Sequence, residues 1–296
     1  MSRSFITIFT PTYNRVHTLP KLWKSLSNQT SKNFEWLIVD DGSTDNTQQV
    51  VEQWIRYATF PIRYHYQQNA GKMAAHNKGV KLANGELFVC IDSDDYISND
   101  CVELIENEWT LWEQRDDIAG ILAYKRLING HNMPFPNIDC LSMLELHKSG
   151  FTGDTTIIIR TDVFKQYPFP ILKGEKFILE GYVYNQISQN YKMRIFPQYL
   201  TICEYMPDGY SNNIIKLQKN YPGGWALCAQ QSYGYSSKLS EKIKNMARFI
   251  AFSRQFGYSS KRIIKDSPNK VICILCYPLG IYVDLKKRIA YKSLTT

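Results

Sequence analysis

Three aspartates fall within four residues, at Asp92, Asp94 and Asp95, directly after the apolar run at 87–91. Carboxylates this close repel one another and raise one another's pKa unless a cation neutralises them. Their oxygens are hard ligands that suit Mg²⁺ or Mn²⁺, and the phosphates of a substrate typically complete such a site. The cluster predicts a divalent metal site. The competing interpretation is a cap for the helix expected to begin near Asp100.

Polar clusters also follow the three preceding apolar runs. They comprise Thr10, Pro11, Thr12, Tyr13 and Asn14 after the first run, Asp40, Asp41, Gly42 and Ser43 after the second, and Asn69, Ala70, Gly71 and Lys72 after the third. One Asp-Gly-Ser sequence is an everyday turn. Ligands of open α/β sheets bind beyond the carboxyl ends of the strands, so four clusters at successive strand ends predict one site.

The segments between these clusters alternate between strand and helix patterns. Apolar runs at 5–10, 34–39, 62–66 and 87–91 are typical of strands, and periodic apolar residues predict helices at 19–29, 43–55 and 73–82. This alternation indicates right-handed crossovers and a mostly parallel sheet flanked by helices. We therefore predict an α/β fold.

The later part of the chain changes character. Further strands are expected at 118–124, 156–160, 192–196 and 201–205, with a loop-rich insert at 131–140 and a helix at 180–190. From residue 206 the pattern is helical. We expect a catalytic domain at 1–205 and a helical, basic region at 206–296.

Charge is divided unevenly between these regions. Residues 1–205 carry 20 basic and 23 acidic side chains, whereas residues 206–296 carry 15 basic and 4 acidic ones, a balance of +11. Such a basic block indicates an anionic partner, either nucleic acid or a membrane surface. The aromatic and basic interleaving of nucleic-acid-binding modules is missing, so no nucleic-acid partner is expected.

The apolar run at 271–283 lies inside this basic region and contains Pro278 and Gly280. A membrane-spanning helix needs about 20 residues, so this run is too short to cross a bilayer. Neighbouring lysines and arginines favour peripheral attachment of residues 261–288 to an anionic membrane. The alternative is a helix packed on the rest of the protein.

Seven cysteines are scattered through the chain, which favours a reducing compartment. Cys273 and Cys276 have zinc-ligand spacing but no second pair, so two buried thiols are expected rather than a metal site. The first residues lack a signal-peptide pattern. We expect a cytoplasmic protein, peripheral on the inner face of the cell membrane. The oligomeric state stays open, with a homo-oligomer as one option.

The strand-end motifs together resemble the inverting glycosyltransferases of family 2, which have the nucleotide-binding GT-A fold. The matching stretches occupy residues 8–15, 37–45, 69–72, 77–79 and 91–95 in the same order and spacing, and weaker matches follow at 153–154, 167–170, 174–177 and 179–181. These motifs resemble a subgroup that builds capsule, teichoic-acid and other surface polysaccharides. The resemblance implies transfer of a sugar from a UDP-sugar donor to a glycan or lipid-linked glycan acceptor.

The resemblance also implies a role for each matching residue. Thr10 and Tyr13 should contact the nucleoside, within the segment that also holds Pro11 and Thr12. Asp41 should accept a hydrogen bond from uracil beside Asp40, and Lys72 should face the diphosphate or the edge of the base. Asp92, with Ser93 next to it, should hold the ribose. Asp94 should coordinate the Mn²⁺ or Mg²⁺ ion, with Asp92 and Asp95 completing the metal site.

Many family members have an acidic pair that begins with the catalytic base, and here the corresponding pair is Glu180-Gly181. Its second acid is absent. Glu180 is the predicted base, and Asp154 and Glu175 are the other candidates. The five dispersed histidines are not expected to be catalytic.

Two other functions deserve comparison. A sugar-1-phosphate nucleotidyltransferase needs a glycine-rich loop after the first strand, and the segment from Thr10 to Asn14 has no glycine. A non-catalytic sugar-nucleotide-binding protein that helps to assemble an envelope glycan complex should have a damaged metal motif, whereas Asp92, Asp94 and Asp95 are intact.

Overall fold

A computed structural model describes residues 5–128, 133–203 and 213–292. The chain forms two compact units. The first consists of Met1–Phe169 and Val183–Met206, and the second of Pro170–Tyr182 and Pro207–Thr296. The boundary expected between residues 205 and 206 lies outside the described ranges. The segment 170–182 belongs to the helical unit.

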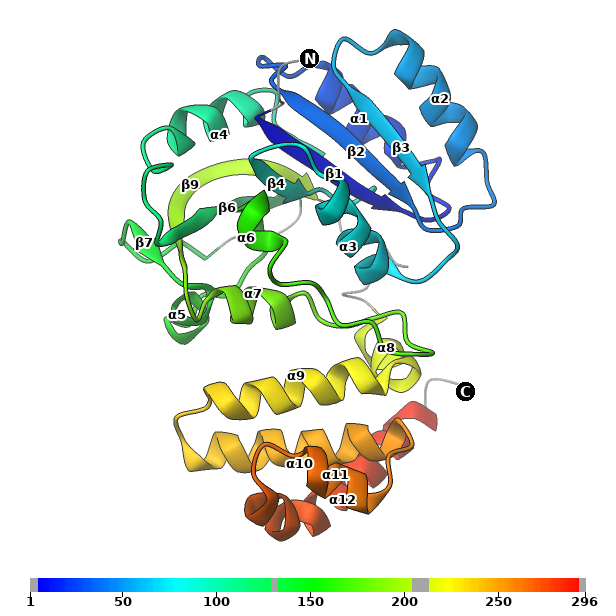
Figure 1. The fold of residues 1–296 in the computed structure, drawn as a ribbon, viewed down its shortest axis with the longest axis vertical. Helices are drawn as coiled ribbons and strands as arrows, with labels where there is room; N and C mark the ends of the chain where they lie inside the picture. The colour runs from blue at the N-terminus through cyan, green and yellow to red at the C-terminus, as the bar shows by residue number, and fades with distance from the viewer. Residues whose placement is uncertain (1–4, 129–132, 204–212, 293–296) are drawn as a thin grey trace. The chain divides into compact units, whose positions relative to one another are not determined.

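Four parallel strands form one half of the sheet in the first unit (Figure 1). Their order is β3 (Ile62–Tyr66), β2 (Phe34–Asp40), β1 (Ile6–Thr12) and β4 (Leu87–Cys90). The connecting helices are α1 (Leu19–Ser27), α2 (Thr47–Tyr57) and α3 (Lys72–Leu82). All residues of β1 and β2 are buried, as expected for strands covered on both faces. The predicted parallel α/β arrangement is confirmed.

The second half of the sheet is mixed. The strand β8 (Thr155–Arg160) runs antiparallel to β4 and to β6 (Ile118–Leu127), and β9 (Lys192–Cys203) runs parallel to β6. The short strands β5 (Tyr96–Ile97) and β7 (Cys140–Leu141) both pair with β9. The helices of this half are α4 (Cys101–Trp109), α5 (Met143–Lys148), α6 (Thr161–Phe164) and α7 (Gly181–Ile187).

The separate strands predicted at 192–196 and 201–205 are wrong, because β9 is one strand of 12 residues. Its register with β6 jumps from Ala123 paired with Phe196 to Tyr124 paired with Tyr199. Pro197 lies in this jump and has no backbone N–H to give to the ladder. The strand therefore contains an irregularity, and the sequence pattern at this point is typical of a break between two strands.

Indole rings dominate the packing between the sheet and its helices. Trp36 of β2 stacks near Trp23 of α1 and Trp54 of α2, with ring centroids 6.2 and 5.7 Å away. Trp36 and the neighbouring aliphatic side chains of β1 are fully buried. Burial of such large apolar surfaces fixes α1 and α2 against the parallel strands.

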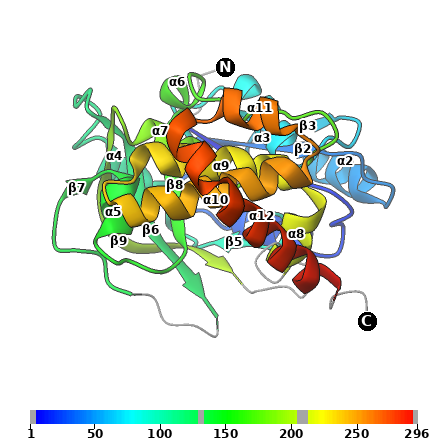
Figure 2. The ribbon, with the colours of Figure 1, turned by 90° about the horizontal axis from the view of Figure 1, so that it is seen from below.

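The second unit is a helical bundle. It comprises α8 (Ile214–Asn220), α9 (Pro222–Tyr235), α10 (Leu239–Gln255), α11 (Ser260–Asp266) and α12 (Lys270–Lys292). The central helix α10 packs against α9 and α12, which lie on either side of it (Figures 1 and 2). The thiols of Cys273 and Cys276 lie in its core, as predicted for two buried cysteines.

The apolar run at 271–283 is part of the longer helix α12, which continues through Pro278. Gly280 lies so close to α10 that an added Cβ would meet Ile250 at 2.5 Å. Close packing on α10 supports the helix across the proline, so Pro278 does not end it. Within the described part of the chain, no helix combines the length and the apolar character that crossing a membrane requires.

Candidate active site

The loops that follow β1 and β2 are tied together by hydrogen bonds. The Asp41 amide donates to the Thr12 carbonyl (2.8 Å), and the Asn14 amide donates to the Ser43 hydroxyl (2.8 Å). The Thr44 amide donates to the Asn14 side chain (2.8 Å). The first two predicted polar clusters therefore form one edge of the sheet.

Asp41 connects this edge to the turn before α3. Its carboxylate accepts hydrogen bonds from the amides of Ala70 (2.9 Å) and Gly71 (2.7 Å) and from the Gln67 side chain (2.8 Å). Gly71 precedes the helix with φ 96°, a left-handed conformation that favours glycine. Asp41 is buried and holds the third cluster beside the second.

Asp40 is also engaged inside the protein. It accepts hydrogen bonds from the Ser43 amide (2.7 Å) and from the Tyr64 hydroxyl (2.6 Å). Burial raises the pKa of Tyr64 above its usual range, and the Asp40 charge adds to this effect. Tyr64 thus keeps its proton, and its hydroxyl donates a hydrogen bond to Asp40.

The end of β1 and the residue that follows it offer few side chains to a ligand. Thr10 is fully buried, and its hydroxyl accepts a hydrogen bond from the Trp36 indole (3.0 Å), so the expected contact of Thr10 with a nucleoside stays a prediction. Pro11 is buried, and the buried Thr12 hydroxyl has no hydrogen-bond partner within the described ranges. Tyr13 is 49% exposed and remains available for stacking.

The three aspartates after β4 form a compact cluster. One carboxylate oxygen from each of Asp92, Asp94 and Asp95 lies within 4.8 Å of the others. Two lysines neutralise part of this charge. Lys72, the first residue of α3, lies 2.7 Å from Asp92, and Lys125 of β6 lies 2.5 Å from Asp95.

The electrostatics of the cluster are those of crowded carboxylates. Burial raises the pKa of Asp94, and repulsion from Asp92 adds to it. Burial raises the pKa of Asp95 to about 7. The charges of Asp92 and Asp94 add to this shift, whereas attraction to Lys125 opposes it. Burial alone would raise the pKa of Asp92 too, but attraction to Lys72 and Lys125 lowers it. Three hard oxygen donors that repel one another fit Mg²⁺ or Mn²⁺.

Lys125 is a site residue that sequence reasoning missed. Burial alone would lower its pKa, but attraction to Asp95 and Asp92 raises it above its usual range, so the side chain stays charged. A single lysine at the end of an apolar run carries no recognisable signal in the sequence. Only the pairing of β6 with β8 and β9 brings it to the aspartates.

The two candidate bases lie in different units. Asp154 precedes β8, and its carbonyl accepts a hydrogen bond from the Lys125 amide (3.3 Å). Burial raises the pKa of the Cys203 thiol to about 11. The charge of Lys125 opposes this shift, and the charges of Asp95, Asp154 and Asp94 add to it. Asp154 therefore lies in the neighbourhood of the aspartate cluster. Glu180 lies directly before α7, is half-buried and belongs to the second unit.

Glu175, the third candidate, has a structural role in the second unit. Its carboxylate accepts hydrogen bonds from the amides of Gly223 (2.5 Å) and Gly224 (2.6 Å) in the first turn of α9. Burial raises the pKa of Glu175, although these hydrogen bonds oppose the shift. Both oxygens are engaged at the helix end, where the N–H groups need acceptors.

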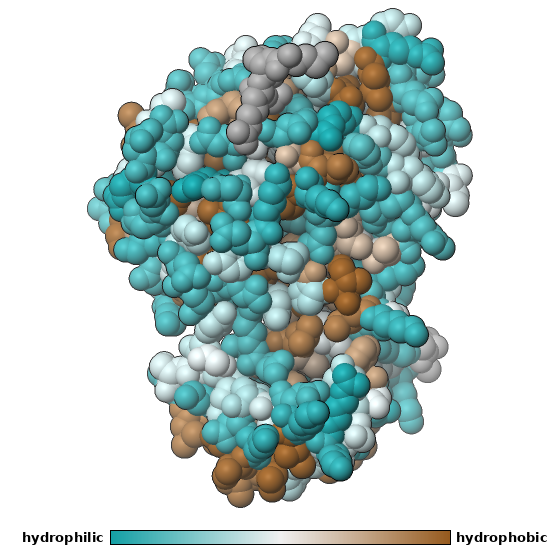
Figure 3. All heavy atoms as spheres, in the orientation of Figure 1, coloured by the Kyte–Doolittle hydropathy of each residue, from teal (hydrophilic) through white to brown (hydrophobic). Residues whose placement is uncertain are grey.

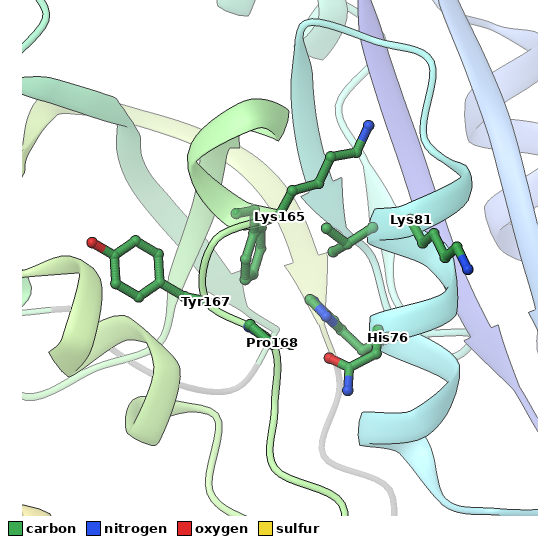
Figure 4. A pocket seen from close by; sticks show the side chains of 8 residues that line it. His76, Lys81, Lys165, Tyr167 and Pro168 are labelled. Atoms are coloured by element: carbon green, nitrogen blue, oxygen red, sulfur yellow. The ribbon is translucent and has the colours of Figure 1, made fainter.

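A pocket of about 530 Å³ lies beside α3 in the first unit. Figure 4 shows His76 of α3 directed toward the segment that follows α6, where Tyr167 and Pro168 lie. His76 is buried among phenylalanines, and neither ring nitrogen has a hydrogen-bond partner among the residues described. Burial lowers its pKa to about 3, so the ring is neutral. His76 is a core residue.

Comparison with known proteins identifies the family. The model of glycosyl transferase family 2 matches residues 7–173. Chondroitin synthase of Escherichia coli is 32% identical over 140 residues, which cover 44% of this chain and 19% of that protein. The poly(ribitol-phosphate) β-N-acetylglucosaminyltransferase TarS of Staphylococcus aureus is 23% identical over 279 residues, which cover 89% of this chain and 47% of TarS. The chain spans less than half the length of these curated relatives.

Solved structures show the same fold. The structure of S. aureus TarS 1–349 in complex with UDP-GlcNAc matches with a TM-score of 0.59 and 19% identity, over 96% of this chain and 89% of that one. The mannosyltransferase PcManGT from Pyrobaculum calidifontis, in complex with GDP-Man and Mn²⁺, matches with a TM-score of 0.56 and 15% identity, over 95% and 86% of the chains. The chain therefore belongs to glycosyl transferase family 2, as its strand-end motifs predict, and carries a glycosyltransferase domain with the GT-A fold.

Proposed function

We propose that this chain is an inverting glycosyltransferase that moves a sugar from a UDP-sugar to a hydroxyl of a glycan or lipid-linked glycan in bacterial surface polysaccharide synthesis. The observation that carries the proposal is the cluster of Asp92, Asp94 and Asp95, with oxygens within 4.8 Å, at the edge of a family 2 sheet. Support for the donor comes from the TarS structure with UDP-GlcNAc, and support for a divalent metal from PcManGT with Mn²⁺.

The donor would be held by side chains at the strand ends. The exposed ring of Tyr13 is suited to stacking on the base. Asp41 keeps one free acceptor position beyond its three internal hydrogen bonds, which a uracil N–H could use. Lys72 provides positive charge for the diphosphate at the start of α3, and Asp92 would contact the ribose. A bound Mn²⁺ or Mg²⁺, held by Asp94 with Asp92 and Asp95, would stabilise negative charge on the departing diphosphate.

The reaction is a single displacement. An acceptor hydroxyl oxygen attacks the anomeric carbon, the bond from this carbon to the diphosphate oxygen breaks, and its electron pair leaves with UDP. A carboxylate takes the hydroxyl proton as general base. Attack opposite the leaving group inverts the anomeric carbon, so an α-linked donor gives a β-glycoside. The name of TarS, a β-N-acetylglucosaminyltransferase, supports this stereochemistry. Glu180 is the proposed base and Asp154 the alternative.

Calorimetry with UDP tests the site directly. We expect UDP to bind at least about tenfold more tightly with Mn²⁺ than with excess chelator, because hydrated ions bridge phosphates to carboxylates. Asp94→Asn should remove this difference. Asp162→Asn is the matched control, since Asp162 is an exposed aspartate of the same unit paired with Arg160. Equal affinity with and without metal would overturn the metal role.

A panel of nucleotide sugars then tests the reaction. A selective donor should raise the melting temperature in the presence of Mn²⁺ by mass action, and a non-ligand should not. The selected donor should yield a glycoside of inverted configuration with a suitable acceptor, as read by proton NMR. A selected donor that gives a product of retained configuration would contradict the single displacement.

A further inference from the structure

The helix α12 has apolar side chains on two opposite faces. One face, with Cys273, Cys276 and Gly280, packs into the bundle. The other carries large apolar residues that are 41% to 75% exposed: Val271, Ile274, Leu275, Leu279, Tyr282, Leu285 and Ile289. We call these seven residues the outer stripe. Apolar side chains gather at the lower edge of the view in Figure 3, where α12 lies in Figure 1.

The outer stripe is continuous along the helix. Apart from the adjacent Ile274 and Leu275, its members recur every three or four residues, the spacing that places side chains on one face. From Val271 to Ile289 the stripe extends over roughly 27 Å, at about 1.5 Å per residue. Scattered exposed apolar residues are ordinary, but an aligned row of this length on one helix indicates an interaction surface.

Most exposed charges around the outer stripe are positive, and the exposed Asp266 of α11 is paired with Arg262. Lys270 and Lys286 are exposed on α12, and Lys261 and Lys265 are exposed on the neighbouring α11. The only acidic residue of α12 is Asp284, which is 1% exposed and accepts hydrogen bonds from Arg254, Gln255 and Arg288. No negative charge of α12 is therefore presented on the face that carries the stripe.

This charge distribution indicates which kind of partner covers the outer stripe. A second copy of the chain would bring the same lysines against one another, and like charges across an interface are unfavourable. An anionic lipid surface attracts each lysine and accepts the apolar side chains between its acyl chains. We propose that α12 lies flat in the surface of an anionic lipid leaflet, with the outer stripe inserted. The proposal is independent of the sugar donor and of the catalytic base.

Vesicle flotation of the full chain tests this proposal. The triple variant Leu275→Ser, Leu285→Ser and Ile289→Ser should bind vesicles of phosphatidylcholine with phosphatidylglycerol at least about thirtyfold more weakly than the wild type. Each substitution removes an apolar side chain that would insert between the acyl chains. A matched control removes three exposed apolar residues of the first unit, Ile55→Ser, Leu111→Ser and Ile138→Ser, and should bind as the wild type. Thermal melting verifies that both variants are folded. If the stripe variant is unfolded, single Leu275→Ser is used and should bind roughly threefold to fivefold more weakly.

The contribution of the lysines to vesicle binding is tested in the same flotation assay. Lys265→Gln, Lys270→Gln and Lys286→Gln together should weaken binding at least about tenfold in 0.1 M salt, and 0.5 M salt should have a similar effect on the wild type. Wild-type protein that stays unbound on anionic vesicles would overturn the proposal. So would a stripe variant that binds vesicles normally but changes from an oligomer to a monomer in light scattering, because the stripe would then be an interface between copies.

Discussion

The aspartate cluster and its two lysines form a group of three acidic and two basic side chains. Lys72 reaches Asp92 from α3, and Lys125 reaches Asp95 from β6, so cations from two elements surround carboxylates that would otherwise repel one another. Burial raises the pKa of both Asp94 and Asp95, and repulsion from the neighbouring carboxylates adds to this shift. A bound cation would relieve this repulsion, which supports the proposal that Asp94 is a metal ligand.

The catalytic base can be identified by a pair of isosteric variants. Glu180→Gln should slow sugar transfer by about a hundredfold to ten-thousandfold, because it keeps the shape and removes the basicity. UDP affinity should stay within twofold of the wild type, as measured by calorimetry. Glu175→Gln is the control: it weakens an anchor of α9 and should leave turnover within about tenfold. If Asp154→Asn abolishes transfer with UDP affinity intact while Glu180→Gln is active, Asp154 is the base.

His76 should make the stability of the protein dependent on pH. Its pKa is about 3 in the folded protein because burial disfavours the charged ring, and it is about 6.5 in an unfolded chain. Below pH 6.5 the unfolded chain takes up a proton that the folded protein does not, so stability is complete above pH 6.5 and declines as pH falls toward 3. Between pH 7.5 and pH 5 this residue should lower the free energy of unfolding by about 2 kcal/mol.

Urea unfolding of His76→Leu measures this contribution. Between pH 7.5 and pH 5, the free energy of unfolding of the variant should fall by about 2 kcal/mol less than that of the wild type. This difference does not depend on the stability of the variant at pH 7.5. His17→Gln is the control, since His17 is exposed, and should retain the wild-type dependence. Equal pH dependence in wild type and His76→Leu would contradict a neutral buried ring.

At the scale of elements, the turn before α3 depends on Asp41. An asparagine has one acceptor oxygen, so Asp41→Asn leaves one of the three donors at Gln67, Ala70 and Gly71 facing an NH₂ group. We expect the free energy of unfolding to fall by about 1–3 kcal/mol, the usual cost of an unsatisfied buried hydrogen-bonding group. Urea unfolding measures it, and Asp162→Asn should change it by less than about 0.5 kcal/mol. If Asp41→Asn leaves the free energy of unfolding unchanged but loses UDP affinity, Asp41 contacts the base and does not stabilise the turn.

The parallel half of the sheet could be predicted because its signals are local. Each of β1, β2 and β4 is an apolar run followed by a polar cluster, and the helix between successive runs has its own periodicity. The fate of individual side chains could not be predicted in the same way. Thr10 appears in a polar motif, yet its position in β1 faces Trp36, a partner 26 residues away in the sequence. Its burial depends on the register between two strands.

The irregular elements escaped prediction for a related reason. Proline is a local signal for a break, yet β9 continues through Pro197, where two separate strands were predicted, and α12 continues through Pro278. In each case tertiary packing supports the element: β9 pairs with β6 on both sides of the irregularity, and α12 packs closely on α10 through Gly280. Contacts between residues far apart in sequence leave no pattern within either segment.

At the scale of the whole molecule, the chain crosses between its two units three times, after residues 169, 182 and 206. The helical unit is therefore more than an appendage to a domain at 1–205, because it includes the segment 170–182. This segment contains Glu180 and the anchor residue Glu175. A candidate catalytic residue thus depends for its local structure on helices that come later in the chain.

Truncation after residue 206 should disorder this segment. In the full chain Phe177 and Ile178 are buried, Glu175 accepts the two amides of α9, and the Gln231 side chain donates to the Tyr182 carbonyl (2.8 Å). Removing α9 exposes both apolar side chains, each of which contributes about 1.5–3 kcal/mol when fully buried. The amides of 170–182 should therefore exchange with solvent at least about a hundredfold faster in a chain of residues 1–206.

Hydrogen exchange followed by mass spectrometry provides the measurement, with the amides of β1 and β2 as the internal control. These amides belong to the buried sheet of the first unit and should keep their protection in the shortened chain. Sugar transfer should be lost together with the protection of 170–182, because Glu180 would no longer be positioned, whereas metal-dependent UDP binding should survive. Full protection of 170–182 in the shortened chain would show that this segment folds without the later helices. Retained transfer despite lost protection would instead exclude Glu180 as the base.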